Sequence, residues 1–478
     1  MLRVENLGYR HLRAEVPALG GLDFQLNSGQ VLVVCGHSGS GKSTLLSILS
    51  GLIPHYFKGE LSGRVTLDGD EPRQSSLRQW GRRTGLMMQN PETQFLAGTV
   101  AEEIALTLRC RQIQAAEAAE LTERQIARFR LEEIRGRSVF QLSEGQKQKV
   151  VLAALTALKP KLLLLDEPSA NLDPFSTAEL AETLAALKDE GLSMVIADHR
   201  LNWLDGLADQ ALVLQQGRTA AQGGWDILGD ESLREQLNLR TIKAPAAISA
   251  AVPPKEPKEP KGAVVVEGLR FAYPGGPEII DGLDAVLPYG RVTVLTGPSG
   301  RGKTTLARLL CGLEKPGGGR ISFGVREGGQ VVLQNADHQL YMATAKAEVE
   351  LSLKVHGVGG GADEILASFG LGELAGRHPQ SLSGGEKQRL VVAAGQAVPA
   401  GLLVLDEPTS GLDGFNLRLM AAQIRRIAAE GPAVLVVTHD LELASLCADY
   451  HLTLPERSAD FDRAGQASPL PRATHPQL

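Results

Sequence analysis

The sequence predicts an α/β fold made of two homologous domains in tandem, each built on a parallel β-sheet that is covered by helices. One observation behind this prediction is that the chain repeats itself over roughly 200 residues. Another is that short β-branched runs at 31–35 and 292–296 lead into glycine-rich loops and then into helical patterns. The third is a Pro-, Lys- and Glu-rich segment between the repeats, at 241–262, which is typical of an extended spacer.

The repeat is carried by four motifs that recur in the same order. The serine of the LSxG motif precedes the strand-ending aspartate by 23 residues in both halves, and that aspartate precedes a histidine by 33 residues in both. We therefore expect a first domain at 1–240, the spacer at 241–262, a second domain at 263–454 and a disordered tail at 455–478. The paired motifs are VENLGYRH (4–11) and VEGLRFAY (266–273), GHSGSGKST (36–44) and GPSGRGKTT (297–305), LSEGQKQK (142–149) and LSGGEKQR (382–389), and LLLLDEPSANLD (162–173) and LLVLDEPTSGLD (402–413).

The composition excludes several classes of protein. Of the 478 residues, 43% are apolar and 22% are charged, an ordinary globular balance. The net charge of −6 disfavours binding to a nucleic-acid backbone through bulk charge. The four cysteines lie far apart without a CxxC pair, which argues against a zinc site or a disulfide framework. The chain shows neither a signal peptide nor an apolar run of about 18 residues, so it is not expected to cross a membrane by itself.

Both halves carry the phosphate-binding pattern GxxxxGK[ST] directly after a predicted strand. The glycines allow backbone N–H groups to surround phosphate oxygens, and the following helix presents its positive N-terminal end. Lys42 and Lys303 are expected to reach the β- and γ-phosphates, and Ser43 and Thr304 to ligate Mg²⁺. A structural glycine turn is the alternative for either loop alone, but two copies in the same context favour phosphate binding. The predicted nucleotide-binding residues of these loops are Gly36, Ser38, Gly39, Gly41, Lys42, Ser43, Thr44, Gly297, Ser299, Gly300, Gly302, Lys303, Thr304 and Thr305.

An Asp–Glu pair ends an aliphatic strand in each half, Asp166–Glu167 and Asp406–Glu407. The aspartate is placed to hold the Mg²⁺ shell, and the glutamate can orient or deprotonate an attacking water molecule. A surface pair that caps the strand is the alternative, and it is the weaker one after a phosphate loop. The pairs therefore predict Mg²⁺-dependent ATP hydrolysis.

The full set of motifs in both halves resembles the ATP-binding-cassette (ABC) ATPase domain, of which LSEGQ (142–146) and LSGGE (382–386) would be the signature motifs. The resemblance implies a RecA-like core with a helical subdomain and an antiparallel β-subdomain. It also implies that the two domains sandwich two ATP molecules head to tail, so that each signature motif contacts the ATP of the opposite half. By resemblance, the catalytic residues are Glu167, His199, Glu407 and His439; the Mg²⁺ ligands are Ser43, Gln89, Asp166, Thr304, Gln334 and Asp406; and the signature contacts are Ser143, Gly145, Ser383 and Gly385.

Two details of the resemblance differ between the halves. The aromatic residue that stacks on adenine in this family corresponds to Tyr273 in the second half, whereas His11 holds that position in the first, with Tyr9 nearby. The first signature has Glu144 where the family usually has glycine, and this carboxylate would face the ATP held by Lys303. Repulsion between like charges is expected to make that site the weaker one, and a neutral role for Glu144 at this position is the alternative.

Three functional classes remain open: a transporter motor, a soluble translation or repair ATPase, and an ATP-dependent regulator. The short Pro-rich spacer favours the transporter motor. The segments at 50–63, 89–108, 198–204 and 334–353 look like those of energy-coupling factor importers, which take up vitamins, vitamin precursors, cobalt or nickel. That resemblance implies a transmembrane scaffold and a small membrane substrate-binding protein as partners, at the cytoplasmic face of the cell membrane. A fused ATPase of a sugar-type importer is the runner-up.

Overall fold

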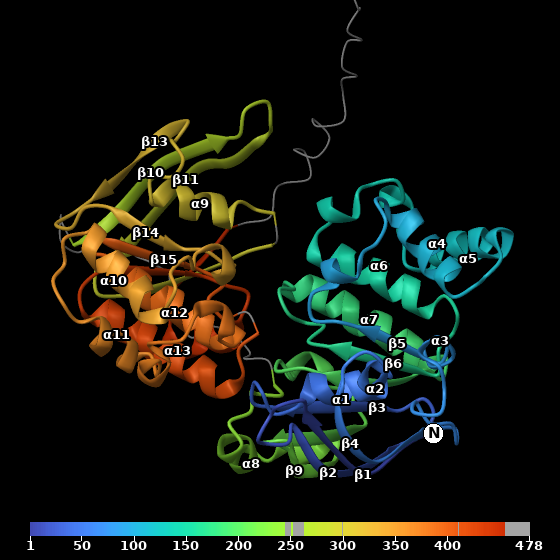
Figure 1. Ribbon diagram of the computed structural model, residues 1–478. Coiled ribbons are helices and arrows are strands. Elements are labelled where there is room, and N and C mark those ends of the chain that lie inside the picture. The colour runs from blue at the N-terminus through green and yellow to red at the C-terminus, as the bar shows by residue number, and fades with distance from the viewer. Residues whose placement is uncertain (244–249, 252–261, 299, 410, 455–478) are drawn as a thin grey trace, which may run out of the picture.

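The computed structural model describes residues 1–243, 250–251, 262–298, 300–409 and 411–454 (Figure 1). The chain forms two lobes that lie side by side, the first running from β1 to α8 and the second from β10 to β17. The three-stranded sheet of the first lobe lies at the bottom of Figure 1 and that of the second lobe at the top. The two lobes are therefore arranged head to tail.

The first lobe combines a mainly parallel six-stranded sheet with a separate antiparallel sheet. The strand order in the large sheet is β5-β6-β7-β3-β8-β9, in which only β9 is antiparallel to its neighbour, and the small sheet has the order β2-β1-β4. Its strands are β1 (Leu2–His11), β2 (Leu19–Leu26), β3 (Val31–Gly36), β4 (Gly59–Leu67), β5 (Thr84–Met87), β6 (Leu162–Asp166), β7 (Ser193–Ala197), β8 (Gln210–Gln215) and β9 (Arg218–Gly224).

The helices of the first lobe cover the large sheet, and α4 and α5 project beyond it at the upper right of Figure 1. Thr99 begins α4 and Ser143 begins α6, each in a capping box in which its hydroxyl accepts from a backbone N–H three residues on. The α-helices are α1 (Lys42–Leu49), α2 (Leu52–His55), α3 (Leu77–Trp80), α4 (Val100–Cys110), α5 (Ala115–Arg128), α6 (Glu144–Thr156), α7 (Pro174–Asp189) and α8 (Glu231–Gln236).

The second lobe repeats this plan with a parallel five-stranded sheet of order β14-β15-β16-β12-β17 and an antiparallel sheet of order β11-β10-β13. Its strands are β10 (Ala263–Ala272), β11 (Glu278–Pro288), β12 (Val292–Thr296), β13 (Gly318–Phe323), β14 (Gly329–Val332), β15 (Leu402–Asp406), β16 (Ala433–Val437) and β17 (Tyr450–Thr453). Its α-helices are α9 (Lys303–Leu310), α10 (Ala345–Val355), α11 (Ala362–Ser368), α12 (Gly384–Gln396), α13 (Gly414–Ala429) and α14 (Leu441–Cys447). The predicted fold class, two tandem α/β domains with parallel cores, is confirmed.

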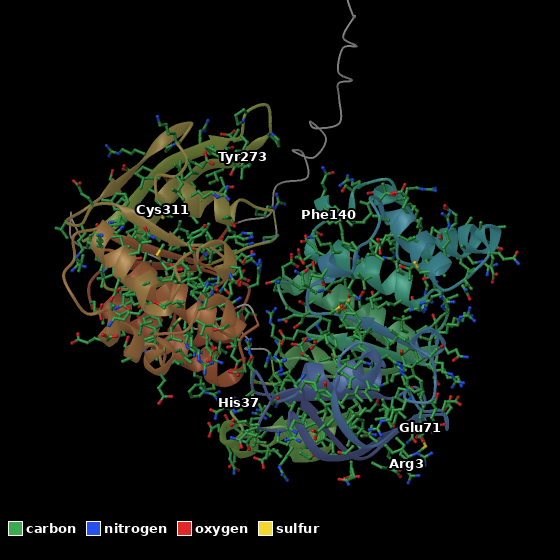
Figure 2. The ribbon with its side chains drawn as sticks, viewed as in Figure 1. Arg3, His37, Glu71, Phe140, Tyr273 and Cys311 are labelled. Carbon is green, nitrogen blue, oxygen red and sulfur yellow. The ribbon has the colours of Figure 1, made fainter. Side chains whose placement is uncertain are left out.

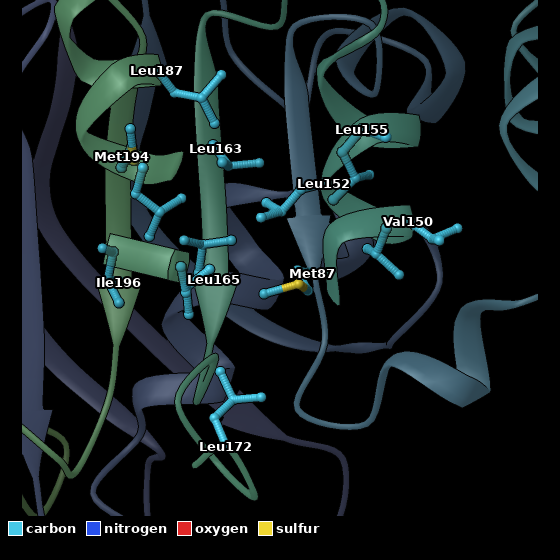
Figure 3. Packing of buried hydrophobic residues seen from close by; sticks show 14 of the residues in the cluster. Met87, Val150, Leu152, Leu155, Leu163, Leu165, Leu172, Leu187, Met194 and Ile196 are labelled. Atoms are coloured by element: carbon cyan, nitrogen blue, oxygen red, sulfur yellow. The ribbon is translucent and has the colours of Figure 1, made fainter. Parts of the chain in front are cut away.

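The aliphatic runs form strands because they are buried on both faces of the sheet. In β6, Leu163 and Leu165 pack into the helical side of the core, whereas Leu162 and Leu164 pack toward α1 and the antiparallel sheet. Figure 3 shows the helical side, where Leu163 and Leu165 lie near Met194 and Ile196 of the neighbouring strand. This two-sided burial explains why these strands are continuously apolar, and it places the polar ends of β6 and β15 at one edge of each sheet.

The segment predicted to be an extended spacer contacts the second lobe at two of its described residues, Thr241 and Ala251. Thr241 N donates to Glu442 Oε1 at 3.2 Å. Ala251 forms a parallel β-bridge with Tyr450 at the edge strand β17. The rest of the spacer, residues 244–249 and 252–261, and the predicted tail at 455–478 lie outside the described residues. Among the helices that are described, none is long and apolar enough to span a membrane.

Candidate nucleotide sites

The phosphate loops connect β3 to α1 in the first lobe and β12 to α9 in the second. Gly36 has φ 139°, and a Cβ there would lie 2.1 Å from the carbonyl oxygen of Leu214, so the tight turn after β3 requires glycine. Lys42 Nζ folds back across the loop and donates to the carbonyl oxygens of Gly36 (3.0 Å) and His37 (2.9 Å). Lys303 Nζ repeats this arrangement with Gly297 (2.7 Å) and Pro298 (2.9 Å). Both loops therefore hold an ammonium group at the start of a helix, as phosphate binding requires.

The predicted loop residues that the structure describes lie at the end of β3, between β3 and α1 or β12 and α9, or in the first turns of these helices. Ser299 lies outside the described residues. Gly41 and Gly302 are the N-caps of α1 and α9, in the left-handed backbone region. Ser43, Thr44, Thr304 and Thr305 follow in the first turns of these helices.

Hard oxygen ligands for a divalent cation come together beside each loop. Thr304 Oγ1 donates to Asp406 Oδ2 at 2.8 Å. In the first lobe, burial raises the pKa of Asp166 to about 6, and a hydrogen bond with Ser43 opposes this shift. Asp166 Oδ1 is buried without a hydrogen-bond partner among the described residues. An orphaned carboxylate oxygen beside a serine hydroxyl fits a Mg²⁺ ion, which prefers such ligands and would neutralise the buried charge.

The candidate catalytic group of the first lobe is tightly connected. Gln89 Nε2 donates to Glu167 Oε2 at 2.8 Å, and His199 Nε2 lies 3.3 Å from Glu167 Oε1. Burial by itself raises the pKa of Glu167, but the hydrogen bond and charge of His199 and the charge of Lys42 outweigh it, so that the pKa lies below its ordinary value. Glu167 is thus held as a carboxylate that can accept a proton from, or orient, a water molecule.

The second lobe assembles the same residue types differently. Glu407 Oε2 accepts from Thr438 Oγ1 at 3.0 Å, and Glu407 Oε1 accepts from His439 N at 3.0 Å, while His439 Nε2 is 3.8 Å away. Burial raises the pKa of Glu407 to about 7. Burial and the nearby Lys303 lower the pKa of His439 to about 4, so its imidazole is neutral near pH 7. Gln334 Nε2 donates across the lobes to Asn171 Oδ1 at 3.4 Å, in contrast to Gln89.

Both glutamates also share an unusual backbone. Glu167 has φ 47° and Glu407 has φ 50°, in the left-handed region that a glutamate rarely adopts. Strain of this kind persists only where the surrounding structure enforces it, and it clusters at functional sites. Its occurrence at the same position in both lobes supports a functional role for the pair.

A cavity of about 660 Å³ lies between the lobes at the second phosphate loop. The second lobe contributes Lys303, Thr304, Glu407 and His439 to its wall. The first lobe contributes its signature motif, Ser143, Glu144 and Gly145, together with Asn171, Leu172, Asp173 and Arg200. The structure therefore places the first signature opposite the second phosphate loop, as the head-to-tail resemblance implies.

At the first phosphate loop, a contact between the lobes is made by Asp413. Its Oδ2 accepts from Ser38 N at 2.9 Å and lies 3.6 Å from His37 Nδ1. Figure 2 shows His37 on the side of the first lobe that faces the second. Ser383 and Gly385 lie at the start of α12, where Ser383 Oγ accepts from Glu386 N at 3.4 Å; no hydrogen bond joins Ser383 to Lys42 within the described residues.

The adenine-side residues also differ between the lobes. Tyr273 follows β10, is half-buried, and packs edge-on against Phe271 with 4.9 Å between ring centroids. Tyr9 is buried in β1 and donates its hydroxyl to the carbonyl oxygen of Lys58 at 3.1 Å. Its ring is therefore committed to core packing. His11 is exposed beside it at the position equivalent to Tyr273, with its ring 4.8 Å from that of Tyr9.

The sequence did not predict the partner of Glu144, and it did not single out several residues that join the lobes. Glu144 Oε1 lies 2.6 Å from Lys147 Nζ, an ammonium group that it shares with Glu92, and this contact opposes the repulsion expected toward ATP. Asp413, Arg200 and Arg240 were not singled out. The sequence does contain one sign of a difference between the sites, because the residue after the histidine is Arg200 in the first half and Asp440 in the second.

Comparison with known proteins agrees with this geometry. The sequence profile of the ABC transporter family matches residues 19–170 and 280–410. An ABC transporter ATP-binding protein of Treponema denticola is 33% identical over 94% of each chain. A Bacillus subtilis protein, named provisionally as an HMP/thiamine import ATP-binding protein, is 33% identical over 97% of this chain and 91% of its own.

Solved structures support the architecture. An RNase-L inhibitor superposes with a TM-score of 0.67 at 23% identity, covering 95% of this chain and 88% of its own. An archaeal ribosome recycling factor, aABCE1, crystallised with the ribosomal stalk protein aP1, gives the same values. At this identity the likeness shows the fold alone. With the profile match and the full-length relatives, it follows that the chain belongs to the ABC transporter family and is an ATPase with two ATP-binding cassettes.

Proposed function

We propose that this chain is the ATP-hydrolysing motor subunit of a membrane importer of the energy-coupling factor type. In this proposal it works with Mg²⁺ at the cytoplasmic face of the cell membrane, on a transmembrane scaffold and a small membrane substrate-binding protein. The observation that carries the proposal is a pair of loops, residues 89–97 and 334–342, that are built alike and expose an apolar side chain at the same place. We call them the docking loops.

The second glutamine of the QxxxxQ pattern braces each docking loop from inside. Gln94 Oε1 accepts from Met88 N at 2.8 Å, and Gln94 Nε2 donates to the carbonyl oxygen of Leu86 at 2.9 Å. Gln339 Oε1 likewise accepts from the N–H of Leu333 at 2.9 Å, whereas its Nε2 donates to the carbonyl oxygens of Leu333 (2.8 Å) and Asn335 (3.0 Å). Because this glutamine closes the loop on itself, Gln89 and Gln334 remain directed toward the nucleotide sites.

A buried glutamate fixes the far end of each docking loop. Glu103 Oε2 accepts from the backbone N–H groups of Leu96 and Ala97, both at 2.8 Å, and Glu348 accepts from Met342 N in the second lobe. Leu96 and Tyr341 then project outward, and each is 75% exposed. Two rigid loops that each hold one large apolar side chain in solvent suit a protein partner.

An ion pair links each docking loop to the helix that begins in the signature motif of the same lobe. Glu92 pairs with Lys147 of α6, and Asp337 Oδ1 lies 2.6 Å from Lys387 Nζ of α12. A partner that moved a docking loop would therefore pull on a signature helix, and the signature contacts ATP in the family. This connection supports coupling between a bound partner and hydrolysis.

The cargo is proposed to be a vitamin or vitamin precursor. The Bacillus subtilis relative, 33% identical across almost the whole chain, is named for HMP/thiamine import. Cobalt, nickel and sugars remain alternatives, because an ATPase contacts the scaffold and not the cargo. The likeness to a ribosome recycling factor, at 23% identity, keeps a non-transport twin ATPase as the second candidate.

The experiment places a photoreactive benzoylphenylalanine at Leu96 or Tyr341 and crosslinks the protein in detergent-solubilised membranes of its own organism. The matched control carries the same group at Leu313, which is 60% exposed. The proposal expects Leu96 and Tyr341 to capture the same integral membrane protein, and Leu313 not to capture it. Reconstituting that protein with the chain should make its ATPase rate respond to Leu96→Glu. Capture of ribosomal proteins from both positions would instead support the second candidate.

A further inference from the structure

The last described segment of the first half, residues 237–242, lies against the second half. We call it the clasp. Leu239 is buried, and a Cβ on Gly414 of α13 would lie 2.4 Å from the carbonyl oxygen of Asn238, so backbone packs directly on backbone. Arg418 Nη2, also from α13, donates to Asn238 Oδ1 at 2.8 Å. The clasp therefore joins the lobes: its apolar side chains Leu237, Leu239 and Ile242 belong to the core of the first lobe, and its Asn238 contacts the second lobe.

Arg240 is the centre of the clasp. Its side chain is only 5% exposed, and its Nη2 lies 2.6 and 2.7 Å from the two carboxylate oxygens of Asp440. Its Nε donates to Glu442 Oε2 at 2.9 Å. Although burial by itself raises it, Arg240 and Arg200 hold the pKa of Asp440 down at about 2. A buried charge of this kind is tolerated only with its partners in place.

Asp440 connects Arg240 to the second nucleotide site. It directly follows His439, and its backbone N–H donates to Thr438 Oγ1 at 3.0 Å. Thr438 Oγ1 in turn donates to Glu407 Oε2 at 3.0 Å. Asp440 Oδ2 also accepts from Thr409 Oγ1 at 3.1 Å, on the loop that follows Glu407. The Arg240 guanidinium is thus connected to the candidate catalytic glutamate through two intervening residues, Asp440 and Thr438.

The first nucleotide site has a different residue at the corresponding position. The residue after His199 is Arg200, and its Nη1 donates to the carbonyl oxygens of Ser169 and Leu172, both at 3.2 Å within its own lobe. Glu167 is instead held by the side chains of Gln89 and His199. The two sites therefore hold their glutamates through different contacts. Among the contacts described, only Glu407 of the second site is linked to a clasp cation, Arg240.

We propose that Arg240 is a positioning residue for the nucleotide site that contains Lys303. Through Asp440 it holds Thr438, His439 and Glu407 in register with the first-half signature, so that one domain directly sets the catalytic geometry of the other. The proposal needs only ATP hydrolysis and does not depend on what hydrolysis drives.

The test measures Arg240→Met separately at each site. In a Glu167→Gln background, hydrolysis comes from the second site, and there Arg240→Met is expected to lower kcat about tenfold with little change in KM, because misplacing a catalytic group by a fraction of an ångström costs this much. In a Glu407→Gln background, hydrolysis comes from the first site, and the same substitution is expected to change kcat less than about twofold. The reason is that Asp413, which contacts the first phosphate loop at Ser38, is held by its own helix cap and not by Arg240. In that cap, Asp413 Oδ1 accepts from Asn416 N at 2.8 Å.

Two further variants keep the test decisive. Arg240→Lys preserves the charge but loses the two-pronged geometry, so it is expected to fold and to show a smaller kcat loss, about threefold, confined to the second site. Arg418→Met removes a hydrogen bond from the same clasp without touching Asp440, and it should leave the ratio of the two sites unchanged. Equal losses at both sites for Arg240→Met or Arg240→Lys, or no loss at either, would overturn the proposal. The proposal would also be wrong if Arg418→Met changed the ratio of kcat at the two sites as much as Arg240→Met does. The effect would then come from the stability of the interface alone.

Discussion

Lys147 Nζ lies 2.6 Å from Glu144 Oε1 and is also paired with Glu92, so one ammonium group joins the first signature motif to the first docking loop. The Lys147 side chain is 7% exposed, whereas that of Glu144 is 37% exposed and lines the cavity between the lobes. The charge of the unusual signature glutamate is thus partly compensated by an ammonium group of its own helix, which it shares with Glu92.

We predict that removing this ammonium exposes the effect that the carboxylate alone would have. Lys147→Met should lower hydrolysis at the second site, since a freed carboxylate about 6 Å from a phosphate costs roughly 1–3 kcal/mol at an effective dielectric of about 20–40. Glu144→Gly alone should change turnover less than about twofold, because the charge is already partly compensated by Lys147. The measurement is the ATPase rate in a Glu167→Gln background.

The chain provides a matched control for Lys147. Lys387 occupies the equivalent position in the second signature helix and donates to Asp337 Oδ1. Gly384 replaces Glu144 there, and among the described contacts Lys387 has no ion pair with a carboxylate of its signature. Lys387→Met should therefore spare the first site. A double variant, Lys147→Met with Glu144→Gln, should recover most of the lost rate. If it recovers none, the loss comes from the docking loop and not from repulsion.

The pH profile of hydrolysis should differ between the two sites. Burial raises the pKa of Glu407 to about 7, so this carboxyl becomes protonated as the pH falls through 7 and then cannot accept a proton from water. The pKa of Glu167 lies below its ordinary value, so it stays ionised over the same range. Glu167→Gln should thus leave an activity that declines between about pH 8 and 6, and Glu407→Gln one that does not. Superimposable profiles would contradict this prediction.

The two halves should pair within one chain. Arg240 binds Asp440 and Ser38 binds Asp413 across the lobes of a single molecule. We expect light scattering to give a mass near 50.9 kDa over a range of protein concentrations, with and without ATP. A mass twice as large that persists on dilution would show that the halves pair between chains.

Much of the fold and of the site is readable from the sequence because it repeats. Two phosphate loops, two Asp–Glu pairs and continuously apolar strands such as Leu162–Asp166 leave few alternatives to a tandem parallel α/β fold with two nucleotide sites. The differences between the halves were harder to anticipate. The pairing of Glu144 with Lys147 depends on side-chain conformation, and Arg240 meets Asp440 only through the packing of segments 200 residues apart. Tyr9 was ambiguous because a strand tyrosine serves core packing and ligand stacking equally well.

The head-to-tail arrangement makes a specific prediction for the two signature serines. Ser143 lines the cavity that contains Lys303, so Ser143→Arg should place a bulky cation there and block nucleotide binding at the second site. Ser383→Arg should affect the first site instead, on the basis of the crosswise resemblance. Photolabelling with 8-azido-ATP and vanadate, followed by peptide mapping, assigns the trapped nucleotide to the Lys42 or Lys303 half. Because arginine also removes the helix cap, worth about 1 kcal/mol, Ser143→Ala is the control for stability. It loses the same cap without the bulk, and it should retain labelling at Lys303. Loss of labelling at Lys42 in Ser143→Arg, with Lys303 intact, would reverse the pairing of signatures and phosphate loops.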